Sequence, residues 1–292
     1  MAPTINANDL AAKYGYAASF FNADPELKKL LAAAVKAQWS PEEFSARFMN
    51  SGWYKNHSSS LKDLLALKAK EPAEYNKRMS DSLANMQTEA GKLGITVDPA
   101  RLKSMATNAV LYAWDQGQID RAFAAEMKYN PNGQPGGDVG SMQSQIRQNA
   151  ADYGITLGDQ DIFSMAQKIV GGSLDQEGAL EHIKQLAAGR YPGLQDEIKK
   201  GLSVREAAST YVQSQARILE VDPNQIDLAT DPNLQKALQA RGPDGKPIPG
   251  GVPLWQYEQQ LKQDPKWLQT NNARQDMNGV ANKVLKDFGL VS

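Results

Sequence analysis

The sequence contains an internal repeat, in which a stretch beginning near Thr88 and ending near Met127 returns sixty residues later without a gap. A register kept over this length is the signature of a duplicated structural unit. The chain is therefore expected to consist of copies of one helical module. The pairs that share the offset are Gly94-Ile95-Thr96 with Gly154-Ile155-Thr156, Ser104-Met105-Ala106 with Ser164-Met165-Ala166, Val110 with Val170, and Asp115-Gln116 with Asp175-Gln176.

Each copy carries the same signal for the start of a helix. Ser40 is followed by Pro41 and, three residues after the serine, by Glu43, which is a capping box with proline in the first turn. Trp39 precedes this cap and is placed to pack on Phe44 as a hydrophobic staple. We therefore expect four helix–turn–helix joints, of which the fourth is the most divergent. The other three joints are Trp114-Asp115, Leu174-Asp175 and Leu202-Ser203.

Apolar residues keep a common spacing around the first three joints. The second set matches the first at an offset of seventy-five residues, and the third matches the second at an offset of sixty. Trp39 and Trp114 are expected in the core between paired helices. The matching sets are Leu27, Val35, Trp39, Phe44 and Phe48; Leu102, Val110, Trp114, Ile119 and Phe123; and Ile162, Val170, Leu174, Ala179 and Ile183.

The remaining pattern is also helical. A short helix is expected at 9–21, and a long helical stretch at 58–93 should break or kink at Pro72 and end at Gly94. Two further helices are expected at 254–263 and 272–288. No window alternates apolar and polar residues well enough to predict a strand. The sequence therefore predicts an all-α fold of tandem helix–turn–helix repeats, with long connecting helices and two Pro/Gly-rich loops.

Turn-forming residues mark the expected boundaries. Residues 130–140 are rich in Gly, Pro and Asn and predict a linker between an N-terminal repeat domain (1–129) and a second one (141–240). Prolines at 243, 247, 249 and 253 mark an arm at 241–253, which is interpreted as either a partner-binding loop or a tether. A C-terminal helical segment (254–292) follows it.

Composition excludes several function classes. The net charge is -1 with dispersed basic residues, so the sequence shows no electrostatic signal for nucleic acid. The absence of cysteine rules out disulfides and thiolate metal sites. No apolar leader or membrane-spanning stretch is found, so the chain is expected to fold in cytoplasm without a membrane segment.

No residue pattern predicts catalysis, a cofactor or a metal. His57 and His182 have no second histidine near them on a helix face, and surface or helix-end positions are favoured for both. Neither a nucleophile elbow nor a phosphate-binding glycine loop occurs. We therefore expect a protein without catalytic, cofactor-binding or metal-ligating residues.

One helical enzyme class remains as an alternative. Ser141-Met142-Gln143 and Glu74-Tyr75-Asn76 are faintly similar to two motifs of lytic transglycosylases, which cleave peptidoglycan. The motifs occur here in reversed order, and the Glu-Ser that should precede the glutamine motif is missing. No glutamate has the apolar setting that a general acid requires. A DNA-ejection role is a further alternative, which the balanced charge disfavours.

Four aromatic residues are candidates for partner contact: Trp53, Tyr54, Trp255 and Trp267. The stretches around Trp53 and Trp267 are polar and each follows an apolar helix. Large aromatic residues are enriched at interfaces but also close the ends of helical modules. We favour the interpretation that Trp53 and Trp267 close the ends of their helical modules, and we retain partner contact as the alternative.

The same stretches resemble a known group of proteins. Gly52-Trp53-Tyr54-Lys55-Asn56, followed by a long Lys-rich helix, is similar to helical repeats in virion proteins of tailed bacteriophages, particularly those of actinobacteria. The segments Leu254-Trp255-Gln256-Tyr257-Glu258 and Asp264-Pro265-Lys266-Trp267 look like the closing part of the same group. The resemblance implies a non-enzymatic structural component of the tail or neck. It also implies other virion proteins as partners, several symmetric copies, and assembly in the host cytoplasm.

Overall fold

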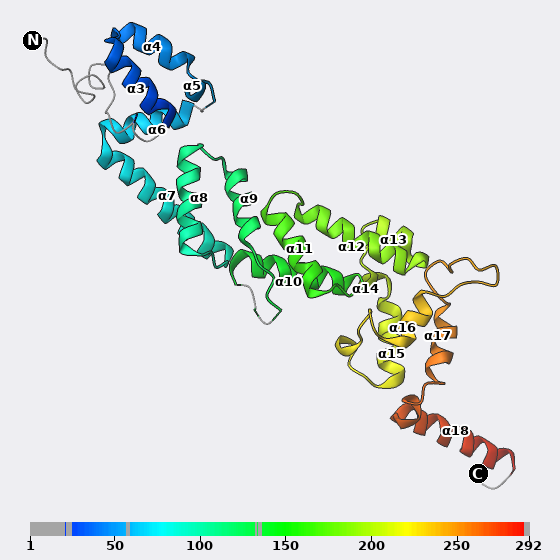
Figure 1. Ribbon diagram of the computed structural model, residues 1–292. Helices are drawn as coiled ribbons and strands as arrows, with labels where there is room; N and C mark the ends of the chain where they lie inside the picture. The colour runs from blue at the N-terminus through cyan, green and yellow to red at the C-terminus, as the bar shows by residue number, and fades with distance from the viewer. Residues whose placement is uncertain (1–20, 22–24, 57–58, 132, 134–135, 289–292) are drawn as a thin grey trace, which may run out of the picture. The chain divides into compact units, whose positions relative to one another are not determined.

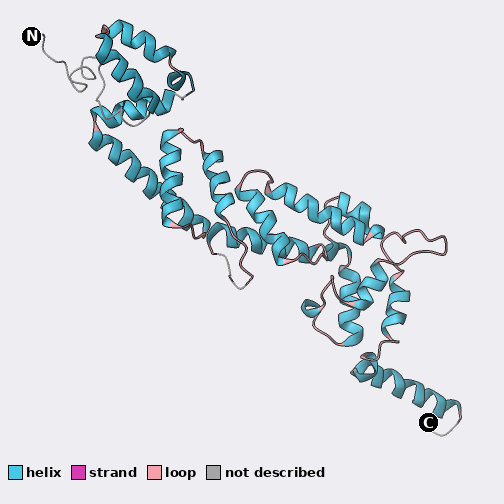
Figure 2. Cartoon of the chain, viewed as in Figure 1, coloured by secondary structure: helices cyan, strands magenta, loops and turns pink. Residues whose placement is uncertain are grey.

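The described residues form an all-helical protein. The structure is a computed structural model and describes residues 21, 25–56, 59–131, 133 and 136–288. Within these ranges there is no β-strand, and the one extended pairing is an isolated bridge between Arg241 and Pro247 (Figure 2). The predicted all-α class is confirmed. The helix expected at 9–21 lies outside the described residues except for Phe21.

The chain divides into two compact units, and the described part of the first covers Phe21 to Gly140 together with 170–172. Helix α7 packs against both α6 and α8 (Figure 1). The break predicted at Pro72 is confirmed, because α6 ends at Lys70 and Pro72 opens α7. The helices of this unit are α3 (Pro25–Ala37), α4 (Pro41–Asn50), α5 (Gly52–Asn56), α6 (Ser59–Lys70), α7 (Pro72–Leu93), α8 (Pro99–Leu111) and α9 (Gln116–Glu126).

The second unit comprises 141–169 and 173–292 in the division of the chain, and its described part ends at Phe288. Helix α15 packs against α17. The helix α10 begins at Gly137, inside the predicted linker, so the linker is shorter than 130–140. The elements are α10 (Gly137–Asp152), α11 (Asp159–Val170), α12 (Gln176–Arg190), η1 (Pro192–Leu194), α13 (Gln195–Lys199), α14 (Val204–Ala207), α15 (Ser209–Leu219), η2 (Pro223–Gln225), α16 (Pro232–Leu238), α17 (Leu254–Leu261), η3 (Trp267–Gln269) and α18 (Asn271–Asp287).

All four predicted joints have the expected helix cap. The cap side chain accepts a hydrogen bond from the backbone N–H three residues later, which satisfies one of the free amides of the first turn. The joints at Asp115 and Ser203 are complete capping boxes. The four bonds run to Ser40 from Glu43, to Asp115 from Gln118, to Asp175 from Gly178, and to Ser203 from Glu206.

The preceding helix also ends in a similar way at each joint. A residue in the left-handed region lies two residues before the cap, or three at the third joint, and the chain turns there. These residues are Gln38, Ala113, Gly172 and Gly201, with φ of 52°, 48°, 70° and 96°. The amide that follows the turn bonds back to the helix, as from Trp39 N to Ala34 O at 3.2 Å and from Trp114 N to Ala109 O at 2.9 Å.

The expectation that Trp39 and Trp114 lie in the core is met only in part, because both are half-buried and Trp39 packs against the core from outside. Each of them directly follows the residue in the left-handed region. Trp39 does pack on Phe44, with ring centroids 6.5 Å apart, which confirms the staple. Its outer face carries the guanidinium of Arg47, 4.4 Å from the ring centroid. The core below consists of more interior positions, including Phe44 and Phe48.

A close backbone crossing lies at the end of α7. Gly94 terminates the helix at φ 73°, as its position predicts, and Ile95 N donates to Ala90 O at 3.0 Å. A β-carbon built on Gly94 would lie 2.1 Å from Gly136 O and 2.7 Å from Gly137 N. The two backbones therefore touch at a point where only glycine fits.

The predicted arm at 241–253 is anchored at its base. Gly250 N donates to Gly193 O at 2.9 Å, and Val252 N donates to Ala237 O at 3.1 Å. The hydroxyl of Tyr211 lies 2.8 Å from Gly250 O, to which it can donate. The second half of this loop is therefore fixed to the second unit and is not a free tether.

Candidate interaction surface

Trp53 and Tyr54 belong to the core region of the first unit. Trp53 is 4% exposed and stacks on Phe48 at 5.8 Å between centroids. Its backbone N–H donates to Glu26 Oε1 at 3.0 Å. Tyr54 is half-buried, lies edge-on to Phe48, and has the Lys62 ammonium 3.6 Å above its ring. Trp53 therefore closes its own helical module, and its burial removes it from the candidate contact residues.

Trp255 and Trp267 lie in the second unit and are more accessible. Trp255 is 63% exposed in the first turn of α17. Trp267 is half-buried, with the Lys262 ammonium 5.7 Å from its ring centroid, and its neighbour Leu268 is 57% exposed. The structure therefore leaves the C-terminal members of the predicted set at the surface.

Helix α18 is attached to the second unit through its first turn. Thr270 caps it by accepting from Ala273 N at 3.0 Å. The Glu220 carboxylate accepts from Asn271 N at 3.0 Å and from Asn272 N at 2.9 Å. These backbone donors hold the pKa of Glu220 below its usual value, because they stabilise the ionised carboxylate. Ala273 is the buried residue of α18.

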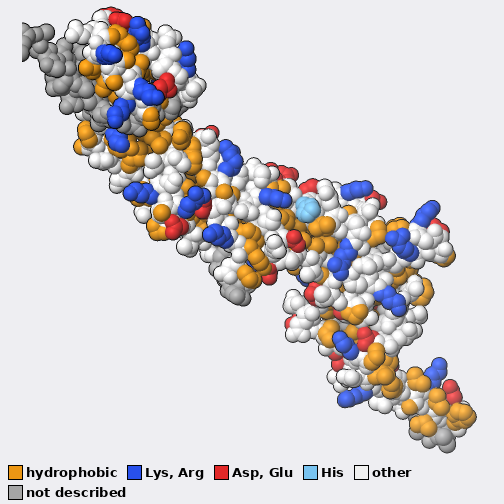
Figure 3. All heavy atoms as spheres, in the orientation of Figure 1, with side chains coloured by type: hydrophobic (Ala, Val, Ile, Leu, Met, Phe, Trp, Pro, Cys, Tyr) orange, Lys and Arg blue, Asp and Glu red, His pale blue; other side chains and the backbone are white. Residues whose placement is uncertain are grey.

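Beyond this anchored turn, the apolar side of α18 faces solvent. Its large side chains recur three and four residues apart, which places them in one stripe of the helix. Met277 is 50% exposed, Val280 64%, Val284 46% and Phe288 76%, and the small Ala281 completes the stripe. Hydrophobic side chains gather over this helix in Figure 3. Such a row on a surface marks an interaction site more often than scattered apolar residues do.

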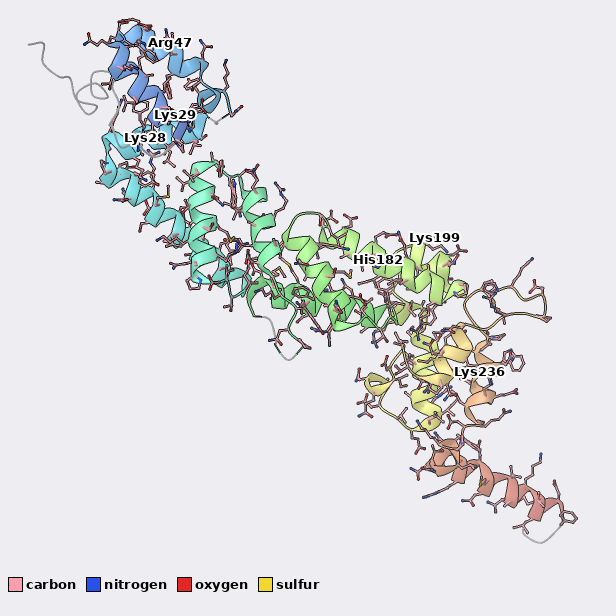
Figure 4. The ribbon with its side chains drawn as sticks, in the orientation of Figure 1. Lys28, Lys29, Arg47, His182, Lys199 and Lys236 are labelled. Carbon is pink, nitrogen blue, oxygen red and sulfur yellow. The ribbon has the colours of Figure 1, made fainter. Side chains whose placement is uncertain are left out.

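The described residues that were considered for chemistry, among them Glu74, Gln143 and His182, lie on three different helices. His182 is exposed on α12 (Figure 4), and His57 lies outside the described residues. No group of three or more metal-ligating side chains occurs among the residues that the structure describes. Glu74 pairs with Arg78 at 3.2 Å on α7, whereas Gln143 is buried on α10. An ion-paired, partly exposed Glu74 differs from the apolar acid site that the enzyme alternative requires.

Burial raises the pKa of several tyrosines. The Tyr257 hydroxyl donates to Gln215 Oε1, and Gln215 Nε2 donates to Asp231 Oδ2 at 2.7 Å. Burial, followed by the charge of Asp231, raises the pKa of Tyr257 well above its usual range. The other oxygen of Asp231 caps α16. This network therefore joins α15, α16 and α17, and its role is structural.

A second tyrosine holds two loops together. The Tyr191 hydroxyl accepts from Gln235 Nε2 at 2.6 Å and lies 3.0 Å from both Gly154 O and Leu228 O, to either of which it can donate. Burial raises the pKa of Tyr191. A neutral hydroxyl at this place can donate to the buried Gly154 O, while Leu228 O also accepts from Gln235 Nε2.

The α18 stripe was not singled out by sequence reasoning, which followed the tryptophans. A signal was present, because the spacing of Met277, Val280, Val284 and Phe288 is readable from the sequence. The same spacing occurs in helices that bury their apolar side, so periodicity alone does not distinguish a core helix from an exposed one.

Comparison with known proteins found no match among protein-family models, curated proteins or solved structures. Among the described residues, no helix is long and apolar enough to span a membrane.

Proposed function

We propose that the chain is a non-enzymatic structural or assembly component of a tailed-phage virion, in the tail or at the head–tail neck. It assembles in the host cytoplasm and stays in the particle, where it contacts other virion proteins and further copies of itself. The resemblance of 52–56 and of the C-terminal segments to phage virion repeats supports a place for the chain in the virion. The exposed stripe of α18 is the observation that carries a role in protein–protein contact.

The form of α18 suits assembly. A helix that is anchored at one end and apolar on one exposed side can enter a groove or pair with another helix, through residues three and four apart. Burying a Val, Met or Phe side chain stabilises a contact by up to about 1.5–3 kcal/mol, before the cost of association. A few such residues are sufficient for reversible contacts that many copies in a particle strengthen together.

The test is the location of the chain in purified particles. Particles from infected cells that produce the chain are analysed by quantitative mass spectrometry, and the chain is then placed by cryo-electron microscopy. A fixed copy number in the tail or neck is expected. Absence of the chain from the particles would contradict the proposal, as would peptidoglycan cleavage by the purified chain.

A pair of variants tests whether incorporation of the chain into particles depends on the stripe of α18. Val280→Asp places a charge in the stripe, whereas Asn282→Asp places the same charge on the opposite side of the same helix. Particles made with Val280→Asp should contain less of the chain or fail to assemble, and Asn282→Asp should have no effect. Equal incorporation of both variants would show that the stripe is not the contact surface.

A further inference from the structure

Charges of both signs border the apolar stripe of α18 along one side. On a helix of 3.6 residues per turn, Asp276 and Lys283 lie two turns apart on the side next to Val280. Both are exposed, and Asp276 Oδ2 also lies 2.8 Å from Lys262 Nζ of the same chain. When a second copy of the helix lies antiparallel to the first, the acid of each copy is therefore near the base of the other.

We infer that α18 pairs antiparallel with α18 of a second copy of this chain. The two-fold axis of this pair lies between the two helices, at the level of Asn278 and Gly279. It places Met277 of each copy opposite Val280 of the other. Symmetry requires each contact to occur twice, as in any isologous interface. The apolar centre of the pair is therefore formed by Met277 and Val280 of both copies, which are exposed in the single chain, while Val284 lies toward the end of the second helix near Ala273.

The same register brings the flanking charges together. Asp276 lies across from Lys283 of the second copy, at the heptad flanks where paired helices exchange ion pairs. A parallel pair in register would instead place Asp276 near Ala281 and Lys283 near Phe288, without an ion pair. Charge therefore favours the antiparallel arrangement.

The area available is sufficient for a weak dimer. In the antiparallel register, Phe288 at the end of α18 lies toward Leu268 of the second copy, which is 57% exposed in the single chain. Complete burial of the exposed parts of the four stripe residues and Leu268 would remove at most roughly 1,000 Å² over two copies, which is near the lower limit for specific interfaces. A reversible dimer is expected, which a crowded particle would strengthen.

The pairing deepens the proposed function, on which it rests for its biological setting, by naming the partner of α18. Its test is separate, because solution mass does not depend on particle composition. A dimer from a chain that is absent from particles would refute the virion role alone. A monomer from a chain that is present in particles would refute the pairing alone.

The experiment measures the mass of the full chain by sedimentation or light scattering between about 1 and 100 μM, a range that spans affinities typical of weak dimers. The mass should rise with concentration from 31.9 kDa toward twice that value. Val280→Asp should keep the chain monomeric, and Asn282→Asp should leave the dimer unchanged. A monomer throughout for the natural chain, or a dimer that Val280→Asp does not weaken, would overturn the pairing. Circular dichroism checks that each variant is folded.

A charge exchange tests the register. Lys283→Glu should weaken the dimer about tenfold, because two surface ion pairs become repulsive contacts. The variant Asp276→Lys, Lys283→Glu, made together with Lys262→Glu to keep the ion pair within the chain, should recover the affinity, since the charges are again complementary. A combined variant as weak as the single one would show that these residues do not face each other.

Spin labels test the direction. The chain has no cysteine, so Lys286→Cys creates a single labelling site. In the antiparallel pair the two labelled positions are about 22 Å apart along the helix axes, from 1.5 Å per residue, whereas a parallel pair brings them level. A label-to-label distance that fits two sites at the same height along the helix axes would contradict the antiparallel arrangement.

Discussion

The crossing at the end of α7 leads to a prediction with a matched control. Gly94 and Gly172 both lie just beyond a helix, with φ of 73° and 70°. A β-carbon on Gly94 would clash with the backbone of Gly136 and Gly137, whereas one on Gly172 meets no atom within 4 Å. Replacing each with alanine therefore separates the conformational cost of the left-handed region from the cost of steric overlap.

The magnitudes follow from these geometries. Gly172→Ala should lower the free energy of unfolding by about 1 kcal/mol, because alanine costs about 1–2 in the left-handed region and loses less entropy on folding. Gly94→Ala should lower it by about 2–4 kcal/mol. The additional 1–3 kcal/mol is the typical cost of an inserted methyl group that displaces packed atoms.

The assay is urea unfolding of the full chain, followed by circular dichroism. Because the chain has two compact units, transitions that separate are fitted individually. Gly91→Ala serves as a second control, since this position within α7 is open and alanine should stabilise the helix by about 0.5–1 kcal/mol. Equal losses for Gly94→Ala and Gly172→Ala would refute the close crossing.

Three further predictions concern hydrogen bonds described above. Asp115→Ala should lower the free energy of unfolding in urea by about 0.5–2 kcal/mol, because it removes a helix cap. An unchanged free energy would show that the cap does not stabilise the protein. Tyr257→Phe should cost about 1–3 kcal/mol by the same measurement, since it leaves a buried oxygen of Gln215 unpaired; a neutral result would contradict the network. The depressed pKa of Glu220 means that its contribution is present above the unfolded-state pKa and is lost as pH falls through the folded value. Backbone resonances of the first turn of α18 should shift over that acidic range in NMR spectra, and persistence of this transition in Glu220→Gln would assign it to another group.

The helix caps were predictable because their signals are local. A helix cap depends on a few neighbouring residues. The side chain of a Ser or Asp before the helix accepts a hydrogen bond from the backbone N–H three residues later. For this reason Ser40, Asp115, Asp175 and Ser203 were identified correctly as caps without knowledge of the fold.

Burial was less predictable because it depends on packing between distant segments. Trp114 has the apolar character of a core residue, yet it directly follows the turn at Ala113 and is only half-buried. Trp53 lies in a polar stretch and is nevertheless buried by helices α3 and α4. Hydrophobicity along the chain therefore indicated the helices well and the exposed surface poorly.

The candidate surface shows the same limit. The sequence contained the stripe of α18 in full, but not the fact that the second unit buries only Ala273 of this helix. The hydrogen bonds from its first turn to Glu220 connect residues about fifty positions apart, which no local pattern reveals.

The way α18 is attached also determines how it can come away. Polar contacts with Glu220, Arg217 and Lys262 and a single buried alanine hold it, so its release exposes little apolar surface. Detachment of this helix is therefore a local opening with a free energy far below that of global unfolding. Proteases should cleave first in the turn between α17 and α18, near Asp264–Thr270, and release a C-terminal peptide while the remaining chain stays folded.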